Sequence, residues 1–232
     1  MTTRFFSTAK RAPHLGPYPL ERLARVEMPD LSQVPVSAPL SFRRPEDPLS
    51  IVNAMAEYQA TMDAIRDGLV NRTLATIPAD PVARAEHLKA FAYFSDASMV
   101  GAGPLPDSAR LTHPLRNPDI DRLAQDLAHK QVKSLASGID MIMADLRDSL
   151  RAPQVSIADH KHALVVLTEM PRDPRPDEPG CDWIRDAQSH RACLRASEVA
   201  VVIANYIRLL GWDARAHTMS TSDVELGQLA VA

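Results

Sequence analysis

Polar side chains that could bind an anionic group gather near the carboxyl-terminal end of the sequence. Arg215 and His217 lie in a segment, 212–219, that we predict to be a β-strand. Alternate residues of a strand share one face of the sheet, so these two side chains should point the same way. Ser220 and Thr221 follow directly. A strand end that meets a helix start is a common anion site, although a solvated edge with ordinary helix capping is the simpler interpretation.

Histidines and cysteines elsewhere give a weaker signal for a metal. His160 and His162 alternate beside Asp159, but no third or fourth ligand stands at a telling spacing. His190 and Cys193 are three residues apart on a predicted helix. Lone helical cysteines are usually small buried hydrophobic residues, so we predict no metal site and leave the catalytic residues unassigned.

Other chemical motifs are missing from the sequence. There is no phosphate-binding glycine loop, nucleophile elbow or paired Cys-x-x-Cys. Gly101 and Gly103 do not make a dinucleotide fingerprint, because a third glycine is missing and Pro104 follows instead of a helix. Simple sequence motifs therefore leave the function open.

Composition narrows the class of protein. The chain has 232 residues, is 45% hydrophobic and 24% charged, and has a net charge of −3 with both signs mixed. These values are ordinary for a globular domain and do not favour a nucleic acid or an acidic membrane surface as partner. Two cysteines and no recognisable export sequence favour a reducing compartment, and we predict a cytoplasmic protein without a membrane partner.

Hydrophobic periodicity supplies the elements that would position these residues. Asp80 before Pro81 is a helix start, because the carboxylate can cap free N–H groups and proline lacks one. Residues 162–168 form a nearly continuous aliphatic run, which is typical of a strand covered on both faces. We predict helices at 50–69, 80–94, 119–150 (with a break at Gly138) and 182–210, strands at 98–102, 162–168 and 212–219, a surface loop at 171–179, and a last helix opened by a Ser222–Glu225 capping box.

The two ends of the chain differ from its middle. Residues 1–48 hold eight of the 19 prolines, so we predict an extended arm there, with a disordered leader as the alternative. Residues 49–232 form the predicted module. Its last helix is apolar through Ala232 without a cap, and we expect the reading frame to continue into a longer protein.

Three stretches resemble a known family. Residues 162–174 (HALVVLTEMPRDP), 180–184 (GCDWI) and 191–217, which include an apolar helix ending in Leu-Gly-Trp, are similar to the long, soluble, catabolic reductive dehalogenases. Residues 95–102 (SDASMVGA) also resemble the related epoxyqueuosine reductases. Those reductases carry an aspartate proton donor near the position of Ser220, and a hydroxyl cannot replace it, which weakens this alternative.

The resemblance implies a fold and a set of cofactors. It implies an α/β (α+β), nitroreductase-like module in which helices pack around a small mixed sheet, incomplete at its carboxyl end. In the intact family member, cobalamin and two iron–sulfur clusters carry out the chemistry, and we expect Gly-Leu-Gly and two Cys-rich runs beyond Ala232. If this copy of the module binds cobalamin, His217, Ser220 and Thr221 are the predicted contacts.

The implied function is that of the amino-terminal part of a reductive dehalogenase acting on haloaromatic compounds. Its partners would be the remainder of its own chain, a small haloaromatic substrate and a redox donor. Long catabolic dehalogenases resemble two fused modules with a degenerate first copy, so a structural module that packs on a catalytic copy is an alternative. An epoxyqueuosine-reductase-like, tRNA-processing enzyme is the other. We expect the 232-residue piece alone to be inactive and prone to associate.

Overall fold

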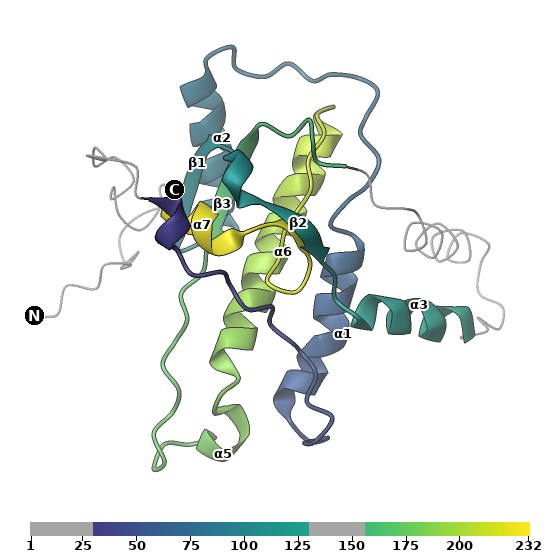
Figure 1. The fold of residues 1–232 in the computed structure, drawn as a ribbon, viewed down its shortest axis with the longest axis vertical. Helices are drawn as coiled ribbons and strands as arrows, with labels where there is room; N and C mark the ends of the chain where they lie inside the picture. The colour runs from purple at the N-terminus through teal and green to yellow at the C-terminus, as the bar shows by residue number, and fades with distance from the viewer. Residues whose placement is uncertain (1–29, 130–155) are drawn as a thin grey trace, which may run out of the picture.

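The computed structural model describes residues 30–129 and 156–232, in which helices pack around two small sheets (Figure 1). This is an α+β arrangement. No helix in the described ranges is long and apolar enough to cross a bilayer. The helices are α1 (Ile51–Ala64), α2 (Pro81–Phe94), α3 (Asp119–His129), α5 (Cys181–Ile184), α6 (Gln188–Leu209) and α7 (Leu226–Val231), with 3₁₀ turns η3 (Leu31–Gln33) and η4 (Asp107–Ala109), and the strands are β1 (Met99–Pro104), β2 (Arg110–Leu115), β3 (His162–Leu167) and β4 (Ser222–Val224).

The start of α2 confirms the capping prediction. The Asp80 carboxylate accepts hydrogen bonds from the N–H groups of Val82 and Ala83, both at 3.2 Å. Pro81 occupies the first helical position, where its missing N–H costs nothing. Helix α3 also begins where the sequence predicts, at Asp119. Its predicted continuation, with the break at Gly138, lies outside the described residues.

Helix α1 is shorter than predicted. The hydrophobic residues recur at helical spacing up to Leu69, but the helix ends at Ala64. The backbone then turns so that the carbonyl of Arg66 accepts from the N–H of Ala216 at 3.0 Å. This long-range bond, which no local pattern records, stabilises the turn.

The predicted helix 182–210 is divided in two. Asp186 has a left-handed φ of 60°, which interrupts helical hydrogen bonding and separates the short α5 from the long α6. The interior of α6 is largely buried as expected, with Val199, Val201 and Ile203 each at most 4% exposed. Gly211 ends the helix with φ +95°, the left-handed cap conformation that glycine favours, which agrees with the predicted helix end at residue 210.

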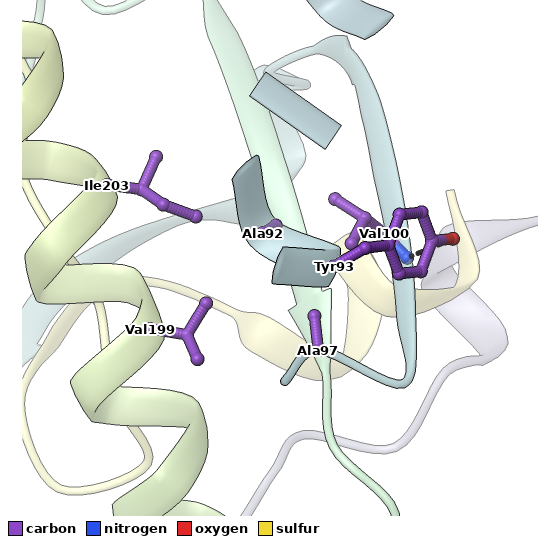
Figure 2. Packing of buried hydrophobic residues seen from close by; sticks show 6 residues of the cluster. All are labelled: Ala92, Tyr93, Ala97, Val100, Val199 and Ile203. Atoms are coloured by element: carbon purple, nitrogen blue, oxygen red, sulfur yellow. Dashed lines mark hydrogen bonds between the residues drawn. The ribbon is translucent and has the colours of Figure 1, made fainter. Parts of the chain in front are cut away.

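Strands β1 and β3 pair antiparallel, with Val100 opposite Val166 and Gly101 opposite Val165. Leu164 and Val166 face a cluster built by α2 and α6, whereas Ala163 and Val165 face α7. Figure 2 shows this first cluster, in which the Tyr93 hydroxyl accepts a bond from the N–H of Val100. The prediction that residues 162–168 are covered on both faces is confirmed in part, because Ala163 to Val166 pack on both sides but are only half-buried, and Leu167 is exposed.

Strands β2 and β4 make a second, irregular antiparallel pair, with Arg110 opposite Val224 and Leu115 opposite Ser222. The sequence analysis missed β2, since Pro114 interrupts its pattern. Both described pairings are antiparallel, where we expected a mixed sheet.

The segment before α7 corrects two predictions. Residues 212–219 form no strand, and the strand is β4, three residues long. Ser222 does not open the last helix, because its hydroxyl bonds the Val224 carbonyl within β4. The N-cap is Glu225, which accepts from the N–H of Gly227 at 3.1 Å.

Residues 34–48 run as a strap along the module, drawn in purple in Figure 1. The N–H of Ser37 donates to Glu225 at one end of the strap, at 3.1 Å. Phe42 is 3% exposed and its ring meets His190 edge-on at 5.2 Å. The strap thus contributes a core side chain.

Two glycines give a matched test of this fold. An alanine Cβ at Gly211 would lie 2.8 Å from the Thr73 carbonyl oxygen, in a left-handed conformation that alanine disfavours. We expect Gly211→Ala to lower the free energy of unfolding by about 2 kcal/mol or more. At Gly103 the added Cβ meets nothing within 4 Å, and Gly103→Ala should change stability by less than about 0.5 kcal/mol. Urea unfolding of both variants checks this, and equal losses would contradict the packing around Gly211.

Candidate functional site

The polar residues singled out at the carboxyl-terminal end do come together, although not on a strand. After Gly211 the chain runs extended beside the end of α1, and residues 218–221 form a turn closed by the Thr218 N–H and the Thr221 carbonyl at 2.9 Å. This turn lies against the start of α3, since the N–H of Asn117 donates to the Thr221 hydroxyl at 3.0 Å. The candidate site is therefore the junction of α1, α3 and residues 214–223.

The centre of this junction is a buried carboxylate. Asp63 is 2% exposed. Its Oδ1 accepts from Gln59 Nε2 at 2.9 Å and from the Thr218 hydroxyl at 2.7 Å. Its Oδ2 accepts from Asn117 Nδ2 at 2.8 Å and from the Ser220 hydroxyl at 2.7 Å. Within the described part of the chain, four neutral donors therefore bond the carboxylate and no cation pairs with it.

Ser220 and Thr221 are committed to this network. Ser220 is 6% exposed and Thr221 is fully buried. The Ser220 oxygen also accepts from Gln59 Nε2 at 3.0 Å. A ligand could reach either hydroxyl only if these bonds broke and the turn moved.

A second network of charges adjoins the first. Asp223 Oδ2 lies 2.8 Å from Arg66 Nη1 and 3.4 Å from Arg215 Nη1. The Arg215 Nε also donates to Asp67 at 3.0 Å. The two guanidinium side chains are only 4% and 3% exposed. Burial alone would raise the pKa of Asp223, but the charge of Arg66 and its hydrogen bond, assisted by the charge of Arg215, hold that pKa below its ordinary value.

His217 is held neutral inside this network. Burial, and then the charge of Arg66, lower its pKa to about 3, against the opposing effect of Asp223. Its Nδ1 accepts from the N–H of Asp223 at 3.2 Å, so the ring proton sits on Nε2. Arg215 and His217 both reach Asp223, although no strand forms there to give the shared sheet face that was predicted.

Two atoms of the junction have no hydrogen-bond partner among the described residues. They are Gln59 Oε1 and Arg66 Nη2, and both are sealed from the surface. Sealed atoms of this kind cannot bind a ligand without movement of their neighbours. The junction resembles a structural core more than an open site.

The other candidates stay apart. His160 pairs with Asp213 at 2.9 Å, and His190 Nε2 bonds the Ser41 carbonyl at 3.0 Å. Burial raises the pKa of Cys193 to about 11, which makes it a poor thiolate ligand at neutral pH. Cys181 bonds the Pro176 carbonyl. Within the described ranges, no three His, Cys, Asp or Glu side chains gather as a possible metal site.

The sequence analysis missed the residues that organise the junction. Gln59, Asp63 and Arg66 recur every three or four residues along α1 and beyond it, the spacing of one helix face. Three polar residues on one line beside an apolar stripe could have indicated a buried polar contact. Their partners could not be found this way, because they lie more than 50 residues away.

Solved structures decide which known proteins share this architecture. The catabolic reductive dehalogenase NpRdhA matches over 98% of the chain at 31% identity, with a TM-score of 0.64. Its complex with 3-bromo-4-hydroxybenzoic acid matches at 32% identity and a TM-score of 0.64. A reductive dehalogenase described in connection with B12-dependent dehalogenation matches at 32% identity and 0.65.

The chain is similar to part of a catabolic reductive dehalogenase. The resemblance inferred from residues 162–217 is thereby confirmed. The chain covers only 26% of the length of these dehalogenases. No protein-family model and no curated protein matches the chain. Contact between cobalamin and His217, Ser220 or Thr221 stays a prediction.

The neutral state of His217 has a measurable consequence. An unfolded histidine titrates near pKa 6.5, so between about pH 6.5 and pH 3 the unfolded chain binds a proton that the folded chain excludes. Stability should therefore fall as the pH falls through this window. In His217→Asn, the amide oxygen can replace Nδ1 as acceptor but does not titrate.

From pH 7 to pH 5, the unmodified chain should lose about 2 kcal/mol more stability than His217→Asn. Urea unfolding at the two pH values measures this difference. Equal losses in the two proteins would mean that His217 is not held neutral by the fold.

Proposed function

We propose that the chain is a structural module, at the amino-terminal side, of a larger cobalamin- and iron–sulfur-dependent reductive dehalogenase. In this proposal the module does not hold the cofactor. The overall reaction would replace a carbon–halogen bond with a carbon–hydrogen bond, consuming two electrons and one proton and releasing halide. The substrate would be a haloaromatic compound.

The observation that carries the proposal is the match to catabolic reductive dehalogenases along nearly the whole chain at 31–32% identity. One of the matching structures is described as B12-dependent, and another contains 3-bromo-4-hydroxybenzoic acid. These properties support cobalamin and a halogenated phenol as expectations for the intact protein. The matches also favour a dehalogenase over a tRNA-processing relative.

The polar junction supports the proposal that the module has no cofactor role. The hydroxyls of Ser220 and Thr221 and the Nδ1 atom of His217 already have partners within the fold. Releasing Ser220 would take a donor away from Asp63 Oδ2. Releasing Thr221 and His217 would leave the N–H groups of Asn117 and Asp223 without an acceptor. Because an unsatisfied buried polar group costs about 1–3 kcal/mol, binding through these groups would have to offset several such costs.

Electron supply also points outside the 232 residues. An iron–sulfur cluster of the cysteine-ligated kind takes four cysteines. The chain has two, Cys181 and Cys193, and both are free thiols. The clusters and the proton donor would therefore come from the rest of the protein.

The test uses the complete gene product, purified without oxygen, beside the 232-residue chain. We expect the complete protein to contain cobalamin and iron and to release bromide from 3-bromo-4-hydroxybenzoic acid with reduced methyl viologen. The 232-residue chain with added cobalamin should match the free-cobalamin control. A complete protein without corrinoid, or halide release by the chain above that control, would refute the proposal.

A further inference from the structure

An exposed apolar surface lies at the carboxyl-terminal end of α6. Leu69 is 98% exposed, Leu74 65% and Leu209 60%; we call these three residues the leucine patch. Isolated exposed leucines are common, but several on adjoining segments mark an interaction surface.

Backbone hydrogen bonds bring the two segments of the patch together. The N–H of Asn71 donates to the Arg208 carbonyl at 2.9 Å, and its side-chain amide donates to the Leu209 carbonyl at 3.1 Å. The N–H of Ala75 donates to the Leu210 carbonyl at 2.9 Å. Residues 69–75 are thus laid along the last turn of α6.

The close approach of Leu74 to Gly211 fixes this arrangement further. A Cβ at Gly211 would lie 3.0 Å from Leu74, so the two backbones touch. Leu74 is consequently held beside the end of α6, which lowers the cost of ordering this part of the loop when a partner binds.

The outer stripe of α6 changes character along the helix. In its first half the exposed residues are charged, namely Arg191, Arg195 and Glu198. In its second half they are Val202, 43% exposed, Asn205 and Leu209. The exposed face of α6 is therefore uncharged where it approaches the leucine patch, whereas other exposed apolar residues such as Val82 and Trp183 belong to separate elements.

We infer that the leucine patch is the surface by which this module docks on an apolar face of the larger, remaining part of the same polypeptide. The inference rests on the proposed function. The matching dehalogenases are about four times as long as the matched segment, which covers 26% of them. In the proposed longer protein, a remainder of that size would be tethered near the leucine patch at high effective concentration. We therefore take this remainder as the partner that covers the patch.

Side-chain footprinting with hydroxyl radicals tests the docking directly. In the 232-residue chain Leu69, Leu74 and Leu209 should be oxidised readily. In the complete gene product their oxidation rates should fall severalfold, whereas Val82, 62% exposed on α2, serves as a control within the same molecule and should keep its rate.

A pair of variants gives the second measurement. Leu69→Ser with Leu209→Ser should leave the melting temperature of the 232-residue chain nearly unchanged, because both side chains are exposed there. The same pair should lower the melting temperature of the complete protein. Val36→Ser with Val82→Ser, at two exposed sites outside the patch, is the matched control and should lower neither.

Equal oxidation of the three leucines in both proteins would overturn the inference. So would protection that appears in the chain alone and rises with its concentration, which would assign the patch to a second copy. A gene product no longer than 232 residues would overturn it as well. Corrinoid content is measured separately, so a complete protein that protects the patch but lacks cobalamin would refute the proposed function alone.

Discussion

The arrangement of the module depends on two buried carboxylates that must be satisfied. Asp63 takes four hydrogen bonds from α1, the start of α3 and the 218–221 turn. Asp223 holds the guanidinium groups of Arg66 and Arg215. Removing one partner of such a buried group costs about 3 kcal/mol or more, because the others are left unpaired. These two carboxylates therefore fix how the end of the chain crosses α1, and with it the position of β4 and α7.

Local signals predicted the elements whose stability is local. Helix α2 begins at Asp80 and Pro81 because capping acts within one turn. Strand β3 follows from its aliphatic run, since any strand of that composition must be covered on both faces. The left-handed cap at Gly211 follows for the same kind of reason. The similarity to reductive dehalogenases came from the resemblance of particular stretches of sequence, because neither motif spacing nor composition indicated it.

The errors lie where distant contacts override local pattern. Residues 212–219 alternate like a strand but bond Arg66 and Thr221 in place of a ladder. Ser222 has the spacing of a capping box with Glu225, yet its hydroxyl is used inside β4. In the candidate site, Ser220, Thr221 and His217 lie in the segment that the sequence singled out, but the partners Asp63, Asn117 and Arg66 were not foreseeable. No local rule relates residues that are more than 50 positions apart.

We propose that the polar junction holds the module together and does not hold a cofactor. Equilibrium dialysis of the 232-residue chain against hydroxocobalamin tests it most directly, with His217→Asn in parallel. The account predicts no retained corrinoid for either protein at concentrations where both remain folded by circular dichroism. One cobalamin retained per chain, and lost in His217→Asn without a loss of fold, would contradict the account.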